Sequence, residues 1–319
     1  MKRYLIFFVI TLSIFANDSI INSYRKNGLK NLEKKLDSAL IDKNYWSKKV
    51  KKGVIKFGWY EKPRYILFCN TNEKKLHLFF VNNNKIKNLL SSDIVIGKDG
   101  IGKEKKGDFK TPIGVYKIVE KKDKIDPNYG PLAYVLNYPN RLDKSFHRDG
   151  YGIWLHGFPL GYNDKNSTKG CVAVPNDNLL KIDKKLDYKK TIVIISPYND
   201  FDKSSKGIVD ILSFIHKWRY YWKYDDFNSY IACYSQDLKS VYGGYKNFFN
   251  RKKDIFSRNY KKKIRFTNIK ITPYPNLYKK SIWRVEMDEF YKASNLKFIG
   301  KKILYLKKEK NGFKIWREL

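Results

Sequence analysis

The sequence places one cysteine, Cys171, where it could act as a nucleophile. It follows Gly170 in "NSTKGCVAVPN", a turn-like run of small and polar residues before a short apolar stretch. A cysteine becomes a strong nucleophile when a neighbouring base takes its proton. Of the four histidines, His156 is the best placed, because it ends "YGIWLH" and the loop over residues 158–169 returns the chain to Cys171. Residue types alone leave two interpretations open, a catalytic pair and a structural cysteine with a buried core histidine.

The elements that must position this pair are short apolar runs between Tyr65 and Ser196. They are rich in Ile, Val, Phe and Tyr and are separated by Asn, Gly, Asp and Pro, which is typical of strands joined by turns. One helix is predicted at "DNLLKIDKKL", with Asn176 as its N-cap. Cys171 is therefore expected in the turn before a short strand, "VAV", that runs into this helix. The other predicted strands are "RYILFC", "KLHLFFV", "SSDIVIG", "IGVYKIV", "AYVLNY", "GIWLHG" and "KKTIVIIS".

Two motifs in this region, taken in order, resemble the L,D-transpeptidase family. "GIWLHG" followed by "STKGCVAV" is similar to the family signature, in which a histidine precedes a Ser/Thr-x-Gly-Cys motif by this distance. "GDFKTPIGVYKI", residues 107–118, resembles the family's upstream Thr-Pro-x-Gly strand. The likeness covers residues 65–196. It implies a mainly β catalytic domain, an L,D-transpeptidase-like β-sandwich with a short helix, whose cysteine attacks the L-to-D peptide bond of peptidoglycan stems.

The resemblance assigns roles to the residues of this signature. Cys171 matches the nucleophile and His156 the general base. Backbone amides around Lys169, Gly170 and Cys171 are the expected oxyanion donors, because developing negative charge needs preorganised dipoles. Gly170 is also expected to let this backbone approach the substrate closely. No metal or other cofactor is expected, because the histidines and cysteines show no ligand spacing such as C-x-x-C or H-x-x-x-H.

Three neighbouring residues are candidates for substrate binding. Thr168 matches the family's Ser/Thr position, and Gly157 follows the histidine as in the family. A turn hydroxyl and a turn glycine are the alternatives for these two residues. Lys169 stands where many members have histidine; its charge either favours the thiolate or belongs to an ordinary exposed lysine.

The sequence departs from the family at the anchor for the substrate carboxylate. Many members carry an arginine two residues after the cysteine, and here that residue is Ala173. Arg141 and Arg148, in "PNRLDKSFHRDGYGIW", are the candidate substitutes, because a guanidinium matches a carboxylate with two parallel hydrogen bonds. Surface arginines without a ligand are the alternative.

The first residues predict export. Lys2 and Arg3 form a basic start, residues 4–15 are an apolar run and Ala16 ends it, as in a cleavable secretory signal. The run is shorter than the roughly 20 residues that span a bilayer, although an uncleaved anchor near the membrane stays open. We therefore predict a signal peptide over residues 1–16 and a periplasmic protein.

An N-terminal helical segment is predicted over residues 17–60. Within it, four leucines recur at helical spacing and form one face. This face packs either on its own domain or on a second copy of the chain, as a homodimer. The leucines are Leu29, Leu32, Leu36 and Leu40.

The run "PYNDFDKSSKG" separates the catalytic domain, residues 61–198, from a second domain, residues 206–319. The second domain is predicted to be α+β, with one long helix leading into an antiparallel sheet. It resembles the nuclear-transport-factor-two superfamily, a bent sheet wrapped by helices around a pocket.

The apolar face of the long helix in this second domain is predicted to comprise Ile208, Ile211, Leu212, Ile215, Trp218 and Trp222. Its strands are predicted at residues 264–272, 281–293, 296–308 and 313–318, with an Asn311–Gly312 hairpin turn before the last. The tryptophans expected in its core are Trp218, Trp222, Trp283 and Trp316.

The formal net charge of +35 does not by itself specify a partner. The basic residues are spread along the whole chain, so the clustered footprint of a nucleic-acid-binding protein is absent from the sequence. An anionic extracellular polymer or a membrane surface is a more natural counterpart for an exported basic protein.

The variant signature and the second domain together resemble a narrower subgroup, the L,D-carboxypeptidases of curved and helical Gram-negative bacteria. These enzymes trim a terminal D-alanine from tetrapeptide stems of peptidoglycan and so influence cell shape. Two alternatives stay open. One is an L,D-transpeptidase that forms 3-3 cross-links or attaches amines to stem peptides, and the other is a non-catalytic protein that binds the cell wall.

Overall fold

The computed structural model describes residues 2–50, 56–82, 85–161, 166–199, 201, 205–277 and 280–319, with side chains described from residue 18 onward except Ser19. Its elements before the second domain are α1 Lys2–Ala39, α2 Lys43–Lys49, β1 Trp59–Tyr60, β2 Arg64–Asn70, β3 Lys75–Asn82, β4 Lys85–Asp93, β5 Gly114–Lys122, η1 Pro127–Tyr129, β6 Ala133–Leu136, α3 Arg141–Ser145, β7 Trp154–Gly157, β8 Val172–Val174, α4 Asn176–Asp183, η2 Tyr188–Lys190 and β9 Thr191–Ser196. The remaining elements are α5 Ser205–Lys223, α6 Phe227–Ile231, β10 Tyr234–Ser240, β11 Gly243–Gly244, α7 Tyr245–Ser257, β12 Lys263–Pro273, β13 Ile282–Lys292, β14 Lys297–Glu309 and β15 Gly312–Glu318.

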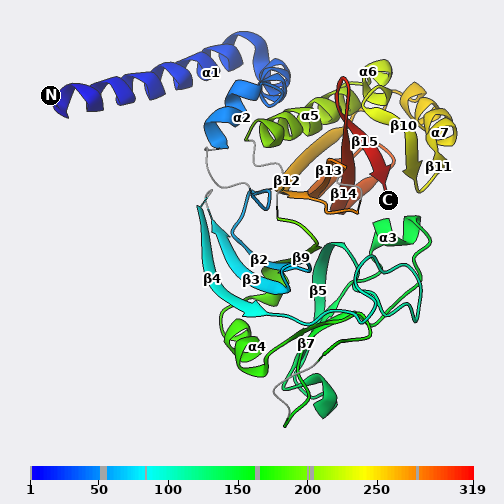
Figure 1. Cartoon of the computed structure of the whole chain (residues 1–319). Helices are drawn as coiled ribbons and strands as arrows, with labels where there is room; N and C mark the ends of the chain where they lie inside the picture. Colours follow the sequence, from blue (N-terminus) through cyan, green and yellow to red (C-terminus); the bar gives the residue numbers. More distant parts are fainter. Residues whose placement is uncertain are drawn as a thin grey trace.

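The catalytic domain is built on one strongly curved sheet. Its strand order is β4-β3-β2-β9-β5-β6-β7-β8, and β2 pairs with β9 in parallel (Figure 1). Leu67 on β2 and Leu155 on β7 belong to the same buried apolar cluster, so the two halves of the sheet close over one core. This arrangement confirms the mainly β fold predicted from the sequence.

Two local predictions in this domain were wrong. "SSDIVIG" is not a separate strand, because β4 ends at Asp93 and Val95 and Gly97 continue only as isolated bridges to Ala173 and Thr168. Asn176 is not the N-cap of α4; Pro175 holds that position, with no side-chain cap. The helix itself forms as predicted, with its Leu179 and Ile182 side chains buried.

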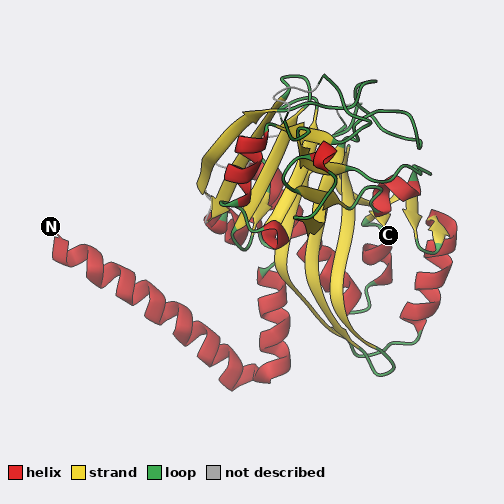
Figure 2. Cartoon of the chain, turned by 90° about the horizontal axis from the view of Figure 1, so that it is seen from below, coloured by secondary structure: helices red, strands yellow, loops and turns green. Residues whose placement is uncertain are grey.

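The N-terminal helix packs on the protein through only part of its leucine face. α1 is bent at Gly28, whose φ of 70° is non-helical, and the part before the bend extends away from the rest of the chain (Figure 2). Leu32 is buried and Leu40 packs against the second domain, whereas Leu29 and Leu36 are exposed. The predicted signal over residues 1–16 lies outside the residues whose side chains are described. Within the described residues, no helix is long and apolar enough to cross a membrane.

The segment predicted as helical over residues 17–60 ends in a strand. Trp59 and Tyr60 form β1, which pairs with β12 and adds an edge strand to the second domain's sheet. Trp46 on α2 is buried in the core of that domain. The N-terminal segment therefore packs with the C-terminal domain, although the catalytic domain separates the two in sequence.

The C-terminal domain is a bent sheet covered on one face by helices, as predicted. Its strand order is β1-β12-β13-β14-β15-β10-β11, and α5, α6 and α7 pack on one side (Figures 1 and 2). The predicted face of α5 is buried, and the four predicted strands form. The hairpin turn falls one residue earlier than predicted, because Glu309 pairs with Gly312. Trp218, Trp222 and Trp283 are core residues, but Trp316 is only half-buried and stacks on Arg317 instead.

A third apolar cluster joins the two domains. The open face of the C-terminal sheet contributes Ile282 and Tyr305, and the catalytic sheet contributes Ile66 and Ile194, all buried. A hydrogen bond from Asn140 Nδ2 to the Tyr274 hydroxyl, at 3.2 Å, crosses the same interface. The two domains therefore share a continuous core and form one packed body.

A buried carboxylate fixes α1 to α5. Asp37 accepts hydrogen bonds from Arg219 at 2.6 Å and Lys223 at 2.5 Å, and from the Tyr224 hydroxyl at 2.9 Å. Burial alone would raise the pKa of Asp37, but the hydrogen bonds from Lys223 and Arg219 outweigh it and hold the pKa below its usual 3.8. The carboxylate consequently stabilises the fold above that pH, and the stabilisation is lost as the pH falls through the lower pKa of the folded state.

We expect Asp37→Asn to lower the free energy of unfolding at pH 7 by about 3 kcal/mol, because it leaves two buried cations without their carboxylate. The matched control is Glu33→Gln, since Glu33 pairs with the same Lys223 but is exposed; its cost should stay below about 1 kcal/mol. Urea unfolding measures both. The deficit of Asp37→Asn should shrink below pH 3.8, and equal costs for the two variants would contradict the assignment.

Candidate active site

Two parallel strands bring Cys171 and His156 to neighbouring positions. His156 is the third residue of β7, and Cys171 immediately precedes β8. The register sets His156 beside Ala173, which follows Cys171 by two residues. Two residues span about 6.6 Å along a strand and return the side chain to the same face. The cysteine and the histidine therefore approach one another across adjacent strands.

The Cys171 thiol is partly exposed and held by backbone groups. The Trp154 amide nitrogen donates to Sγ at 3.4 Å, and Sγ donates to the Gly152 carbonyl oxygen at 3.4 Å. Both partners lie on the segment that enters β7 and leads to His156. The other cysteines, Cys69 and Cys233, are buried, and burial raises the pKa of each thiol to about 12. Cys171 is thus the one cysteine of the chain placed for reaction.

His156 is buried and oriented by a backbone carbonyl. Its Nδ1 lies 2.6 Å from the Gly157 carbonyl oxygen. A carbonyl only accepts, so Nδ1 carries the proton and Nε2 keeps a lone pair that can take a proton from a thiol. Gly157 thus orients His156 through its backbone carbonyl. A side chain at Gly157 would collide with Asn176 and lie 2.8 Å from Pro131, which explains the glycine.

Two aromatic residues near the histidine were missed by the sequence analysis. The Tyr129 ring packs edge-on against His156, with centroids 5.1 Å apart, and contacts the Trp154 ring at 5.1 Å. Tyr129 is the last residue of η1, whose N-cap is Asp126. The "DPNYG" run is a recognisable turn signal, but nothing in the linear sequence ties it to a histidine 27 residues later.

Thr168 braces the turn that presents the cysteine. Its Oγ1 donates to the Cys171 carbonyl oxygen at 2.7 Å and accepts from the Gly170 amide at 3.0 Å. Its backbone pairs with Ile96 and Lys98. Thr168 is buried, so these contacts support a positioning role for the hydroxyl rather than the predicted contact with substrate.

The structure corrects the role predicted for Gly170. Its amide is taken by the Thr168 hydroxyl, which removes it from the set of oxyanion donors. A Cβ at Gly170 would lie 2.7 Å from the Lys110 carbonyl oxygen, and the φ of 120° also favours glycine. Gly170 therefore makes a close approach to the protein's own backbone.

Lys169 and Ala173 lie on either side of the cysteine in contrasting environments. Lys169 is exposed, whereas Ala173 is fully buried, with its backbone bridged to Val95 on one side and paired with His156 on the other. A long charged side chain at position 173 would meet this packed core. The close packing around Ala173 is therefore incompatible with the arginine that many family members carry at this position.

The two candidate arginines are engaged at the domain interface. Arg141 Nη1 donates to the Leu319 carbonyl oxygen at 2.8 Å, and Arg148 Nη1 pairs with the buried Asp143 at 2.7 Å. Neither makes a hydrogen bond or ion pair with Cys171 or His156 within the described residues. Their predicted role as substitutes for the missing arginine has no support in these contacts.

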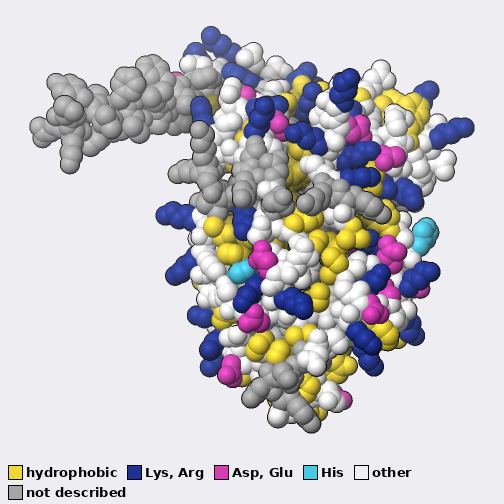
Figure 3. Space-filling view, in the orientation of Figure 1, with side chains coloured by type: hydrophobic (Ala, Val, Ile, Leu, Met, Phe, Trp, Pro, Cys, Tyr) yellow, Lys and Arg dark blue, Asp and Glu magenta, His cyan; other side chains and the backbone are white. Residues whose placement is uncertain are grey.

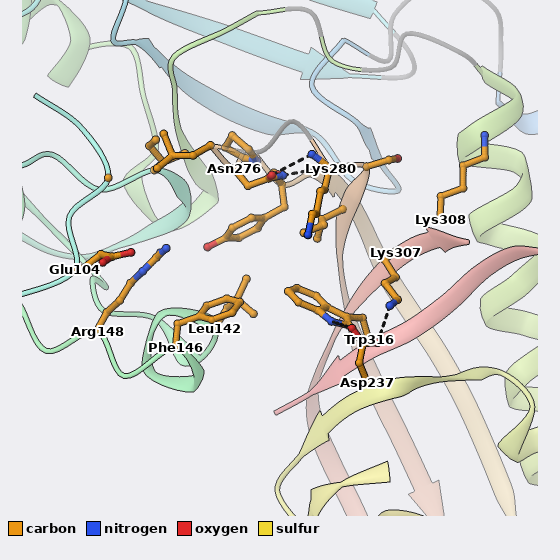
Figure 4. Close-up of a pocket in the computed structure, with 17 residues that line it drawn as sticks. Glu104, Leu142, Phe146, Arg148, Asp237, Asn276, Lys280, Lys307, Lys308 and Trp316 are labelled. Carbon is orange, nitrogen blue, oxygen red and sulfur yellow. Dashed lines mark hydrogen bonds and ion pairs between the residues drawn. The ribbon is translucent and has the colours of Figure 1, made fainter. Parts of the chain in front are cut away.

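Arg148 instead lines a cavity of about 580 Å³ between the domains (Figure 4). Glu104 and Phe146 approach it from the catalytic domain, and Asn276 and Trp316 from the C-terminal domain. Neither reactive residue, cysteine or histidine, is among the described residues that line it. This cavity is therefore separate from the candidate active site.

Charge is dispersed over the visible surface. Figure 3 shows lysine and arginine side chains scattered among acidic and apolar ones, with no single basic stripe on the face shown. In the described ranges, no three His, Cys, Asp or Glu side chains gather as they would around a metal ion.

Two known domain families match successive parts of the chain. The L,D-transpeptidase catalytic domain matches residues 64–195, and the Cds6 C-terminal NTF2-like domain matches residues 210–319. The solved structure of the helical cell shape determining protein Pgp2 from Campylobacter jejuni is 34% identical, with a TM-score of 0.81, over 88% of this chain and 100% of that one. The chain belongs to the L,D-transpeptidase family.

A second solved structure is similar to this chain over most of its length. Bd1075 from Bdellovibrio bacteriovorus is 28% identical, with a TM-score of 0.64, over 80% of this chain and 91% of that one. No curated protein sequence matches the chain. Family membership supports a peptidoglycan-modifying enzyme with an accessory NTF2-like domain.

We expect Cys171 alone to react with iodoacetamide in the native protein at pH 8, because burial holds the pKa of Cys69 and Cys233 near 12. Peptide mass spectrometry after a short pulse measures labelling at each cysteine. His156→Gln should slow labelling of Cys171 by about tenfold or more, since it removes the base. Unfolding in urea should expose all three thiols; equal labelling of the three in the native state would refute this placement.

We expect Thr168→Val to destabilise the protein by about 1–3 kcal/mol, because it leaves the Gly170 amide and the Cys171 carbonyl without their partner in a buried turn. Thr168→Ser keeps the hydroxyl and is the matched control. Urea unfolding and the rate of Cys171 alkylation should both change in the valine variant and stay near wild type in the serine variant. Identical behaviour of the two variants would show that the hydroxyl does not brace the turn.

Proposed function

We propose that this protein is an L,D-carboxypeptidase that removes the terminal D-alanine from tetrapeptide stems of peptidoglycan and leaves tripeptides. The observation that supports the proposal is the parallel pairing of β7 with β8, whose register sets the carbonyl-oriented His156 level with Ala173, two residues after the partly exposed Cys171. The proposal is also supported by likeness over 88% of the chain to a protein described as determining helical cell shape.

In the proposed mechanism, His156 Nε2 takes the proton of the Cys171 thiol, and the thiolate attacks the carbonyl carbon that precedes D-alanine. Backbone amides of the turn other than that of Gly170 stabilise the tetrahedral oxyanion. The carbon–nitrogen bond then breaks, and His156 returns the proton to the amine of the departing D-alanine. This step leaves a thioester between the stem and Cys171.

Water completes the cycle. His156 takes a proton from water as the oxygen attacks the thioester carbonyl, and collapse of the second tetrahedral intermediate releases the tripeptide carboxylate and restores the thiol. An L,D-transpeptidase would use the amine of a neighbouring stem in place of water. We favour water because Ala173 replaces the arginine common in the family and because the chain resembles the carboxypeptidase subgroup.

The proposed substrate places the protein outside the cytoplasm. We propose a periplasmic location, reached through the signal over residues 1–16, and a role in cell shape. This role is proposed by analogy with the described role of the Campylobacter jejuni relative.

Digestion of purified tetrapeptide muropeptides tests the reaction. We expect tripeptides and free D-alanine, detected by chromatography and mass spectrometry. Cys171→Ala should reduce the rate by at least about 10³-fold, while Cys233→Ala, a buried thiol in the other domain, should retain it. Dimers in place of tripeptides would identify a transpeptidase, and no change with the wild-type enzyme would point to a non-catalytic wall-binding protein.

A further inference from the structure

A second cavity between the domains is lined mainly by charged side chains. Its volume is about 490 Å³, and it lies between strands β2, β5 and β9 of the catalytic domain and β12, β13 and β14 of the C-terminal domain. Of its 13 lining residues, six are basic and two are acidic, so the lining carries an excess of four positive charges. The basic residues are Arg64, Lys117, Lys189, Lys270, Arg284 and Lys301.

One buried carboxylate serves three of these cations. Glu286 is fully buried and accepts from Lys117 Nζ at 2.6 Å and Lys270 Nζ at 2.6 Å, and it also pairs with Arg284. A single negative charge cannot neutralise three positive ones. The centre of the cavity therefore keeps a net positive charge, which is costly to hold away from water.

The ionisation of Lys117 reflects this imbalance. Burial, and next the charge of Arg284, lower the pKa of Lys117 to about 8, even though Glu286 lies in contact with it. Burial also lowers the pKa of Lys270. A further negative charge in the cavity would favour the protonated form of both lysines.

Part of the lining has unused hydrogen-bonding capacity. The Nε atom of Arg64 is buried without a hydrogen-bond partner among the described residues, although its Nη2 donates to Asn268 Oδ1 at 3.0 Å. Asn268 has a φ of 53° at an irregularity in β12, and its Nδ2 donates to Asp288 at 3.0 Å. The chain thus adopts a left-handed conformation, which asparagine tolerates, at a point where it forms the cavity wall.

Two cations of the lining are exposed. Lys189, on η2, and Lys301, on β14, form no ion pair in the part of the chain that the structure describes. They extend the positive lining from the buried centre to the surface.

We propose that this cavity binds a small polyanion with at least two phosphate or carboxylate groups. The excess of four charges exceeds what one monovalent anion neutralises, and 490 Å³ is many times the roughly 30 Å³ that a water molecule occupies. Lysine and arginine donors form their strongest hydrogen bonds with such oxygens.

The bound polyanion would connect the domains. Arg64, Lys117 and Lys189 come from the catalytic domain, and the other three cations come from the C-terminal domain. A ligand held by both groups stabilises their mutual arrangement by binding the folded protein alone. This site does not depend on the carboxypeptidase proposal, because it shares no residue with the catalytic pair.

Sodium pyrophosphate is the first probe, added to the full chain at pH 7 with sodium chloride at equal ionic strength as the reference. We expect pyrophosphate to raise the thermal unfolding midpoint in a saturable way and to give a defined Kd by calorimetry. The double variant Lys189→Gln/Lys301→Gln should weaken this affinity by about tenfold or more, because it removes two of the oxyanion donors. Lys246→Gln/Lys253→Gln, which removes the same charge from the exposed face of α7, should bind like the wild type.

A competition experiment distinguishes carboxylate groups of stem peptides from phosphate groups as the natural ligand. In the Cys171→Ala variant, which prevents turnover, displacement of pyrophosphate by a tetrapeptide muropeptide would identify stem carboxylates as the ligand. Failure of the muropeptide to compete would identify a phosphate compound. The proposal is overturned if pyrophosphate stabilises the protein no more than chloride does, or if both double variants respond alike. Muropeptide turnover by the wild type tests the carboxypeptidase proposal separately.

Discussion

The parallel pairing of β7 with β8 is the constraint on which the active site depends. Parallel neighbours cannot be joined by a tight turn, so the chain must leave β7 after His156 and return through a long connection before it presents Cys171. The register is enforced by burial, because Leu155 and Val172 pair and both enter the core. A slip of β8 by one residue against β7 would turn the side chains of its strand to the opposite face and separate the thiol from the imidazole. Packing of ordinary aliphatic residues thus determines where the reactive groups meet.

The site achieves its polarity mostly with backbone groups. A carbonyl orients His156, an amide and a carbonyl hold the Cys171 sulfur, and a threonine hydroxyl ties the turn together. A neutral carbonyl fixes the imidazole tautomer without adding a charge, whereas a carboxylate in that place would also stabilise the imidazolium. The use of backbone groups also brings chain segments close together beside the cysteine and the histidine, where the neighbouring residues are glycines. Gly157 and Gly170 are required by close contact with neighbouring chain segments.

The sequence predicted what local patterns determine and missed what distant packing determines. Strand runs and the amphipathic helix α5 follow from periodicity and turn residues, whereas the cysteine–histidine pair was assigned through the resemblance of two motifs to a known family. The parallel pairing of β10 with β15 and the addition of β1 to the C-terminal sheet join segments that carry no mutual signal in the sequence. Trp316 was expected in the core because of its size, yet a neighbouring cavity and Arg317 give it a half-exposed position. Arg148 was a candidate anchor for a substrate carboxylate, but the buried Asp143 was not recognisable as its partner from sequence.

The apolar cluster between the domains has a consequence for how this protein can be divided. Ile66 and Ile194 point out of the catalytic sheet toward the C-terminal domain, and β1, which enters the C-terminal sheet, lies just before β2 in the chain. Cutting the polypeptide near residue 200 would strip the catalytic sheet of its cover and leave an edge of the accessory sheet unpaired. The boundary between the two family matches in the sequence is therefore not a boundary between independently folding units. The accessory domain contributes part of the hydrophobic core of the enzyme.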